Sequence, residues 1–490
     1  MRVTFIDFNY HLASDGARLL AAILREHGHA VKMIFTSHID HWKVLTTAEE
    51  FRRDFGDTEI YLFSFLSPNL YRALWFTDFI KKAHPGVPIV WGGVHPSAMP
   101  EDSLKHVDIV GNMEAEESLP ALLKKMEAGE DYYNVAGFWF KKPDGTIVKN
   151  PLWPQTTDLD SLPVPLYDLA IESIFHEGRL VPMTDELMKT YYSPYMFGVP
   201  AYTVFGSRGC PYICSYCYHS ELAAHYNSRR VRYRNLVNVI HDDIKPMLKK
   251  HSFFQAVGFM DDDFFLFKKD HLKEFCDLWK KEVKLPFGAL GNPTTITSEK
   301  LEMLVDAGLQ YLQIGIQTGS ERLKKEVYDR PAPNKVLLDA IKKMDPFARN
   351  GKFGVYGDFI IDNPYETNDD ILETLKLYRQ LPDWMTLNVF TLIFYPGSSI
   401  YNRALKEGRI NTSYDVFSKE FSNLSQAENR RYMTYVFLLN FFKKKDLPDW
   451  VFRFLMSKPV RAIGNRLPQW LVEGVYGKKI WPRIHKGLLY

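Results

Sequence analysis

The sequence predicts an α/β protein with a doubly wound parallel sheet at the N-terminus, a partial barrel of strand and helix units after it, and a helical C-terminal region. Three observations predict this fold class. Short apolar runs alternate with helix-period segments through the first 125 residues, the alternation resumes near residue 201 for six further units, and it ends after Tyr401. Such alternation is typical of parallel sheets that are covered by helices.

The composition describes a packed globular protein of more than one domain. A chain of 490 residues exceeds what one hydrophobic core usually spans. With 46% hydrophobic, 14% aromatic and 24% charged residues, it is unlike a disordered, collagenous or coiled-coil chain. A net charge of +2 argues against a protein that holds nucleic acid through many phosphate contacts. Without a signal peptide or an apolar run of about 18 residues, we expect a cytoplasmic protein.

Residues 1–136 are predicted to form a Rossmann-like domain. Its apolar strand segments are residues 3–8, 31–35, 59–65, 87–93 and 107–112, and its helix-period segments are 17–29, 71–84 and 116–126. Ligands of such sheets bind where the strands end. The loops to examine are therefore 9–16, 64–69, 92–96 and 111–116.

The middle and the end of the chain divide into three further parts. Residues 137–200 are expected to hold a hairpin and a Pro-rich linker that wraps across both domains. Residues 201–401 are expected to form a (β/α)6 partial barrel like an incomplete TIM barrel. Residues 402–490 are expected to be helical, basic and aromatic.

Three cysteines lie in one short loop. Cys210, Cys214 and Cys217 have the spacing C-x3-C-x2-C directly after the first strand of the second domain, too close together for an ordinary disulfide framework. Three thiolates leave one iron of a 4Fe-4S cluster without a protein ligand and open to a small molecule. A structural zinc site completed by His219 and a set of inert thiols are the alternatives. Cys276, in a predicted helix, is expected to be a small core residue.

This loop, with Tyr216 before its last cysteine and six strand-helix units after it, resembles the radical S-adenosylmethionine (SAM) superfamily over residues 201–401. The resemblance implies that Cys210, Cys214 and Cys217 hold a 4Fe-4S cluster whose open iron chelates SAM. It also implies that one electron from a donor such as flavodoxin or ferredoxin splits SAM into methionine and a 5′-deoxyadenosyl radical.

Segments that end later strands match positions where this family contacts SAM. The resemblance implies SAM contacts by Tyr216, Asp261, Asp262, Gln317, Ser320, Asp358 and Glu366. Gln317 stands where the family usually has Glu, and a helix N-cap is an equal alternative for the acids of residues 261–263. Arg232 and Arg234 match a basic pair of the family, although a solvated charge pair is an equal alternative.

The N-terminal domain is similar to that of the cobalamin-binding subclass, because Gly92 to Pro96 matches its G-G-x-H-P segment. The similarity implies cobalamin contacts by Asn9, Ser64, Gly92, Gly93 and His95. His11 is a candidate cobalt ligand, although its surroundings match the D-x-H-x-x-G pattern poorly. A degenerate domain without cobalamin is the alternative. The absence of cysteine before Cys210 argues against a methylthiotransferase, which needs a second triad there.

The C-terminal tail concentrates the basic charge. Residues 440–490 carry 11 Lys and Arg against 3 Asp and Glu. Packing over the barrel mouth is one interpretation, and contact with an anionic membrane surface that gives access to a lipid-like substrate is another. A nucleic-acid role is not expected, because no reader motif is present.

Together these resemblances imply a cobalamin-dependent radical SAM enzyme that methylates an unactivated carbon of a small or lipid-like substrate. Radical cyclisation or carbon–carbon bond formation without methyl transfer is the alternative reaction. A non-catalytic protein that carries cobalamin or a cluster is the alternative class.

Overall fold

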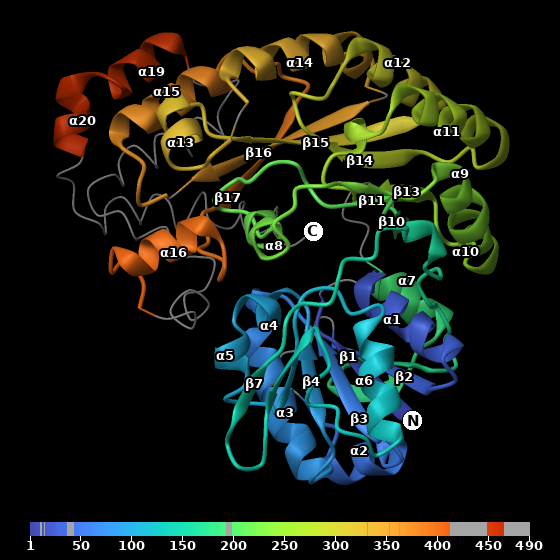
Figure 1. Ribbon diagram of the computed structural model, residues 1–490. Helices are drawn as coiled ribbons and strands as arrows, with labels where there is room; N and C mark the ends of the chain where they lie inside the picture. Colours follow the sequence, from blue (N-terminus) through green and yellow to red (C-terminus); the bar gives the residue numbers. More distant parts are fainter. Residues whose placement is uncertain are drawn as a thin grey trace.

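The computed structural model describes residues 1–9, 12–13, 15–36, 44–192, 198–330, 332–351, 353–361, 363–411 and 448–464. Figure 1 shows two α/β halves, a lower N-terminal half around one sheet and an upper half around a second, curved sheet with helices along its outer side. The predicted fold class of two parallel α/β sheets is confirmed.

The N-terminal sheet has nine strands in the order β7-β6-β5-β4-β3-β1-β2-β8-β9. Their bounds are β1 (Arg2–Asp7), β2 (Ala30–Phe35), β3 (Ile60–Ser64), β4 (Ile89–Gly92), β5 (Ile109–Gly111), β6 (Phe138–Lys141), β7 (Ile147–Lys149), β8 (Glu172–His176) and β9 (Arg179–Pro182). The pairs formed among β1 to β5 and β8 are parallel, whereas the pairs β5–β6, β6–β7 and β8–β9 are antiparallel. The order reverses between β1 and β3, which is where doubly wound sheets bind ligands.

The range 137–200, predicted as a hairpin and a linker, supplies both edges of this sheet. The hairpin β6–β7 pairs with β5 at one edge, and the hairpin β8–β9 pairs with β2 at the other. Between them the chain crosses the sheet end, with a 3-10 turn at Leu159–Ser161. These hairpins pair with backbone groups that β2 and β5 would otherwise leave unpaired.

Helices cover both faces of the N-terminal sheet. They are α1 (Asp15–Glu26), α2 (Ala48–Phe55), α3 (Leu70–Ala83), α4 (Val94–Ala98), α5 (Pro100–Ser103) and α6 (Ser118–Glu127), followed by α7 (Asp185–Tyr191) after the sheet. Alternate side chains of β1 point to opposite faces of the sheet and so belong to two different hydrophobic cores. Val3 and Phe5 pack with α1 and α6, whereas Ile6 packs with α2 and α3.

The second sheet has six parallel strands in the order β10-β13-β14-β15-β16-β17. They are β10 (Ala201–Val204), β13 (Ala256–Phe259), β14 (Phe287–Gly291), β15 (Leu309–Gln317), β16 (Gly354–Ile361) and β17 (Thr386–Thr391). A short antiparallel ladder, β11 (Ser207–Arg208) with β12 (Arg232–Tyr233), follows β10. Because β10 and β17 stand at opposite ends of this order, the barrel is partial.

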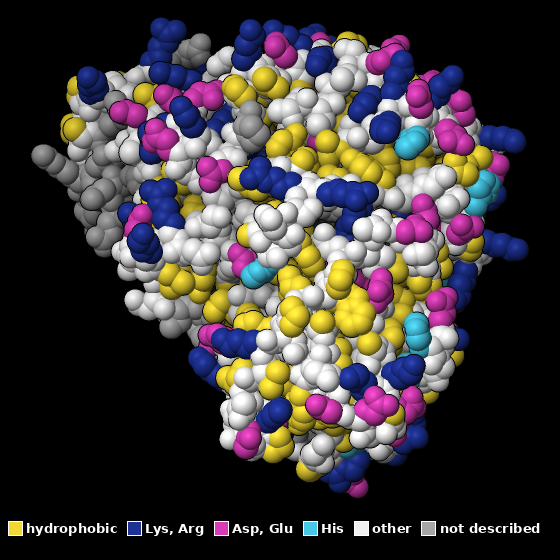
Figure 2. All heavy atoms as spheres, viewed as in Figure 1, with side chains coloured by type: hydrophobic (Ala, Val, Ile, Leu, Met, Phe, Trp, Pro, Cys, Tyr) yellow, Lys and Arg dark blue, Asp and Glu magenta, His cyan; other side chains and the backbone are white. Residues whose placement is uncertain are grey.

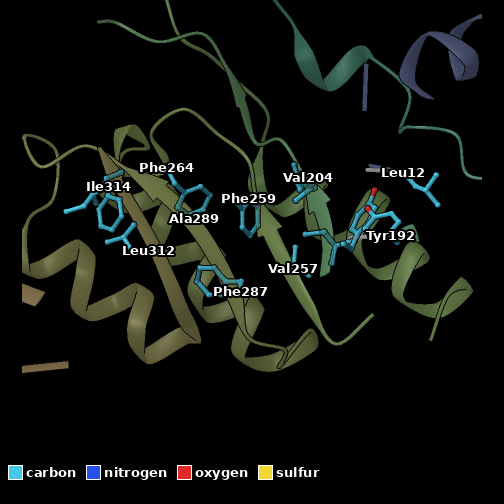
Figure 3. Packing of buried hydrophobic residues seen from close by; sticks show 14 of the residues in the cluster. Leu12, Tyr192, Val204, Val257, Phe259, Phe264, Phe287, Ala289, Leu312 and Ile314 are labelled. Carbon is cyan, nitrogen blue, oxygen red and sulfur yellow. The ribbon is translucent and has the colours of Figure 1, made fainter. Parts of the chain in front are cut away.

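The helices of the second half are α8 (His219–His225), α9 (Leu236–Asn238), a π-helical turn (Val239–Ile244), α10 (Lys245–Lys250), α11 (Lys269–Glu282), α12 (Ser298–Ala307), α13 (Glu321–Glu326), α14 (Asn334–Ala348), α15 (Asn368–Tyr378) and α16 (Ser399–Lys406). Buried side chains from Val204 to Ile314 follow one another across the strands (Figure 3). In β16, Val355 and Phe359 belong to this core, whereas Tyr356 and Asp358 alternate with them and stay partly exposed on the inner side of the sheet.

The C-terminal region is described in part, with helices α19 (Asp449–Leu455) and α20 (Lys458–Gly464). Residues 412–447 and 465–490 lie outside the described residues, so most of the predicted tail falls there. None of the helices described combines the length and the apolar character that crossing a lipid bilayer requires.

Candidate active site

The three cysteines lie on one loop between β11 and α8. Cys214 is buried and the other two thiols are partly exposed, and all three are free. Gly209 has φ 98°, and a Cβ there would meet the carbonyl oxygen of Arg230 at 3.0 Å. A glycine therefore lets the chain turn out of the ladder into the loop. Burial raises the pKa of Cys210 to about 12 and of Cys217 to about 11, so metal binding must displace the protons.

Arg330 lies beside this loop although it is 116 residues further along the chain. Its Nη1 is 3.7 Å from Cys214 Sγ and 3.3 Å from the Tyr216 hydroxyl, and its Nη2 donates to the Gly315 carbonyl at 2.7 Å. Arg330 could not be predicted from the sequence, because no spacing in the chain connects it to the cysteines. It places a positive charge next to a thiol that the family uses as a cluster ligand.

The three acids after β13 have three different environments. Asp261 is fully buried and accepts from the Gly206 amide at 3.1 Å and the Ser207 hydroxyl at 2.5 Å, and burial raises its pKa to about 6. Asp262 is partly exposed, with His219 Nε2 2.7 Å from its Oδ1. Asp263 accepts from Phe265 and so caps a helical turn. Asp262 is thus the acid of the three that faces the cysteine loop.

The two candidates at the end of β15, Gln317 and Ser320, also have different environments. Gln317 is buried at a positive φ of 60°, where the pairing with β16 shifts register, and its Oε1 has no hydrogen-bond partner. The Ser320 hydroxyl accepts from Leu323 as the N-cap of α13 and donates to Asp370 at 2.5 Å. Gln317 therefore keeps a free acceptor, whereas Ser320 is engaged in a helix cap.

The candidates on and after β16 are both largely enclosed. Asp358 accepts from the side-chain amides of Gln313 at 2.7 Å and Asn388 at 3.0 Å, and burial raises its pKa. Glu366 is buried, and its backbone amide donates to the Asn363 carbonyl at 2.9 Å. The polar chain through Asp358 lies on the inner side of the barrel sheet.

A cavity of about 390 Å³ lies between the two halves, at the carboxyl ends of the N-terminal strands. Its wall includes Ser64, Gly92 and Gly93 on one side and Ser207 and Arg208 on the other. The remaining wall is mainly apolar, with Phe5, Leu19, Leu20, Leu62, Phe63, Val90, Leu119, Phe138, Leu159, Leu162, Pro163, Pro165, Tyr202, Val204 and Phe205. In Figure 2, hydrophobic side chains also reach the surface where the two halves meet.

Gly93 shapes one edge of this cavity. It has φ 95°, and a Cβ there would lie 2.7 Å from the Phe65 nitrogen and 2.8 Å from its carbonyl oxygen. His95, two residues later, is 1% exposed, lies 3.0 Å from the Ser67 hydroxyl and stacks on Phe65. Burial lowers the pKa of His95 to about 4, so it is neutral. His95 therefore supports the turn from within rather than lining the cavity.

Asn9 does not line the cavity either. Its amide nitrogens donate to the two carboxylate oxygens of Asp7 at 3.0 and 3.1 Å. His11, the candidate cobalt ligand, lies outside the described residues. The structure thus brings Ser64, Gly92 and Gly93 to the cavity, but not Asn9 or His95.

Acidic residues after β5 connect the two halves. Arg208, two residues before Cys210, donates to Glu116 at 2.5 Å and lies 3.7 Å from Glu114. Both carboxylate oxygens of Glu114 accept from Arg232, which is 3% exposed. Arg232 is thus a buried contact between the halves, and its acidic partner could not be predicted from the sequence because the two residues are 118 positions apart.

Two family models match the chain. The B12 binding domain matches residues 1–123, and the radical SAM superfamily matches residues 204–380. An uncharacterized methyltransferase of Pyrococcus horikoshii is 24% identical over 81% of this chain and 79% of its own length. The anaerobic magnesium-protoporphyrin IX monomethyl ester cyclase of Rubrivivax gelatinosus is 25% identical over 78% of this chain and 66% of its own length.

A solved structure shares the fold over both halves. The cobalamin-dependent SAM radical enzyme OxsB, with aqua-cobalamin and SAM bound, superposes with a TM-score of 0.64 at 16% identity, covering 100% of this chain and 75% of that one. The radical SAM methyltransferase TsrM of Kitasatospora setae, with cobalamin and a [4Fe-4S] cluster bound, superposes with a TM-score of 0.62 at 15% identity, covering 83% of this chain and 78% of that one. Three free thiols on one loop and an apolar cavity edged by Gly93 fit these groups. The chain is a radical SAM enzyme and belongs to the branch of that superfamily that carries an N-terminal B12 binding domain.

Proposed function

We propose that this enzyme transfers a methyl group to an unactivated carbon of a small or lipid-like substrate. The observation that carries the proposal is the shared cavity. It is lined by the ends of the N-terminal strands and also by Ser207 and Arg208, which directly precede the cysteine loop. One chain therefore holds two cofactor sites next to each other, and proximity of this kind lowers the barrier to a reaction between bound groups.

In this proposal each cofactor has its own residues. Cys210, Cys214 and Cys217 hold the cluster. Tyr216, Asp262 and Gln317 are the SAM contacts that the geometry supports best. Tyr216 lies in the cysteine loop, Asp262 faces it, and Gln317 has a side-chain oxygen without a hydrogen-bond partner. Asp261, Ser320, Asp358 and Glu366 act from further away, by fixing the strand ends. Ser64, Gly92 and Gly93 face cobalamin, and Asn9 and His95 hold the loops behind it.

When bound, the cluster supplies the electron that splits SAM, and cobalamin supplies the methyl group. The chain's own residues bind and orient. Arg330 balances negative charge at the Cys214 end of the loop, and Asp261 holds the segment before the loop by accepting from the Gly206 amide and the Ser207 hydroxyl. The apolar cavity wall excludes water from the space between the two sites.

Isotope transfer tests the proposed reaction. The reconstituted full chain, supplied with cobalamin, a flavodoxin or ferredoxin reductant and SAM with a deuterated methyl group, is incubated with an extract of small molecules and lipids. We expect 5′-deoxyadenosine and a product that carries the labelled methyl group. The variant with Cys210, Cys214 and Cys217 replaced by Ala forms neither and lacks the iron-sulfur absorption, whereas Cys276→Ala, in the core of α11, keeps both. Iron content and turnover that survive the triple substitution contradict the assignment.

Radical cyclisation is the second candidate, because the cyclase relative matches 78% of this chain. The same experiment separates the two reactions. Cyclisation gives 5′-deoxyadenosine and a new product without the labelled methyl group. A chain that makes no 5′-deoxyadenosine with a full cluster supports the carrier alternative instead.

Contact with an anionic membrane is the proposed route to a lipid-like substrate. In α19 and α20, Trp450, Phe454 and Ile463 are exposed by 60% or more, and the exposed Arg453 and Lys458 lie among them. Apolar and basic side chains together on a surface favour anionic headgroups. Sedimentation with vesicles of phosphatidylglycerol but not of phosphatidylcholine is the expected result, and it is lost in the variant with Trp450 and Phe454 replaced by Ser.

A further inference from the structure

The cavity wall contains charged groups that the proposed function does not use. Four acids line it, namely Asp15, Glu114, Glu116 and Asp243. Two of them have their partners within the protein. Asp243 accepts from Arg234 at 2.9 Å and from Tyr202 at 2.5 Å, and Glu114 accepts from Arg232 with both oxygens. The other two are incompletely paired.

Asp15 and Glu116 each keep one buried oxygen without a hydrogen-bond partner. These atoms are Asp15 Oδ1, at the start of α1, and Glu116 Oε2, after β5. Glu116 is 8% exposed, and its other oxygen accepts from Arg208. A third orphan on the same wall is a donor, Nε of Arg234. Buried polar atoms of a native protein nearly always have partners, so these three atoms point to a polar ligand.

The three unpartnered atoms indicate which hydrogen-bonding groups the ligand must present to them. Two acceptors and one donor around an apolar cavity match a group that has both N–H and C=O, whereas a simple cation would leave the Arg234 donor unpaired. Burial and the nearby Asp243 raise the pKa of Asp15 to about 7, against the opposing effect of Arg18, Arg208 and Arg234, so a further negative charge is disfavoured there. Carboxamides meet these requirements, and they form the periphery of a corrin ring.

We propose that Asp15 and Glu116 accept hydrogen bonds from carboxamides of cobalamin, and that Glu116 transmits cobalamin binding to the cluster loop through Arg208. The inference rests on the proposed function. Arg208 is a positioning residue in it, since it pairs with Glu116 in one half and stands two residues from Cys210 in the other. The ladder register Arg208↔Arg232 keeps that part of the backbone fixed.

Two corrinoids test the amide contacts. Dicyanocobinamide carries amides around its ring, whereas the heptamethyl ester of cobyrinic acid has no N–H. Binding of both to the full chain is measured by absorbance titration. We expect a preference for cobinamide that falls roughly tenfold in Asp15→Ala and in Glu116→Ala, as for one lost hydrogen bond. The matched control is Glu117→Ala, because Glu117 is the exposed neighbour that does not line the cavity.

The outcomes are distinct. A preference that is unchanged in Asp15→Ala and Glu116→Ala overturns the inference and leaves the proposed function standing. A wild-type chain that binds neither corrinoid overturns the proposed function together with the inference. Comparing two ligands on the same variant removes a general loss of folding from the result, because such a loss weakens both ligands equally.

Electron paramagnetic resonance of the reduced cluster tests the coupling. In the wild type, saturation with cobinamide is expected to change the g values of the cluster, since the ligand redistributes the charge that Glu116 offers to Arg208. In Arg208→Gln, saturated with cobinamide as judged by the absorbance titration, this response is expected to disappear. A wild-type spectrum that does not respond, or a response that survives in Arg208→Gln, overturns the coupling.

Discussion

The buried ion pair between Arg18 and Glu172 is predicted to be the most sensitive charged contact of the N-terminal half. Both side chains have an exposed fraction of 0%, and their two contacts measure 2.7 and 3.1 Å. Arg18 also donates to the carbonyls of Leu12 at 2.9 Å and Leu166 at 2.8 Å, and its guanidinium lies 3.8 Å from the centre of the Tyr167 ring. The pair ties α1 to β8, the strand next to the edge strand β9.

The magnitude follows from what Arg18→Met leaves behind. The Glu172 carboxylate stays buried and keeps the Asp168 amide, at 2.9 Å, as a donor. Removing one partner of a buried pair typically destabilises a protein by about 3–5 kcal/mol. The double variant Arg18→Met with Glu172→Met removes the unpaired charge. It leaves two carbonyls without their donor and the Asp168 amide without its acceptor, at about 1 kcal/mol each. We therefore expect losses of about 4 kcal/mol for the single and about 3 kcal/mol for the double variant.

Guanidinium unfolding, with circular dichroism for the transition of the N-terminal half, measures these free energies. The matched control is Arg25→Met in the same helix. Arg25 makes an exposed ion pair with Asp168 at 2.8 Å, so a loss below about 1 kcal/mol is expected. The reasoning is refuted if Arg18→Met loses no more than Arg25→Met, or if the double variant is no more stable than the single one. Because Leu19 and Leu20 of α1 line the cavity, Arg18→Met should also weaken cobinamide binding.

Three further predictions concern the cavity edge, the barrel and the cluster. Gly93→Ala should lower the unfolding free energy, measured by urea titration, by about 2 kcal/mol more than Gly86→Ala does. Both glycines have positive φ, but of the two only Gly93 would place a Cβ against backbone atoms. For Asp370, burial opposes ionisation, but hydrogen bonds from Arg322, Ser320 and Thr367 outweigh it and lower the pKa to about 2. The ionised Asp370 carboxylate therefore stabilises the folded protein fully above about pH 4, and this stabilisation is lost as the pH falls towards 2. Asp370→Asn should flatten the dependence of the unfolding free energy on pH in this window. The matched control is Asp369→Asn, at an exposed neighbouring position, which should leave it unchanged. Arg330→Met should lower the reduction potential of the cluster, because it removes a positive charge 3.7 Å from Cys214. Arg330→Lys keeps the charge and should keep a potential close to that of the wild type. Redox titrations followed by electron paramagnetic resonance measure the three potentials, and equal values in all three proteins would exclude this charge effect.

Much of the fold could be predicted because its signals are local. Apolar runs of strand length and helix-period segments follow one another, and the structure has parallel strands and covering helices in the same order. The edges were harder to predict. The hairpin β6–β7 was expected within residues 137–200, but the Pro-rich part of that range has the turn residues of a linker, and two of its short segments become β8 and β9 beside β2. Pairing of that kind depends on the partner strand and not on the segment's own composition.

The sequence by itself determined the cysteine loop, because the three thiols lie within eight residues and their spacing is a property of one loop. The resemblance of that loop to the radical SAM superfamily implied the cluster and SAM. Only the tertiary structure decided which candidate side chains are available. Ser320 is engaged in a helix cap and His95 lies behind the cavity wall, whereas Gln317 and Glu116 keep unpartnered oxygens. Arg330 reaches Cys214 from 116 residues away. The physical reason is that the hydrogen-bond partners of a buried polar atom are the residues that folding brings next to it. Many of these residues are far away in the sequence, so the spacing along the chain does not predict them.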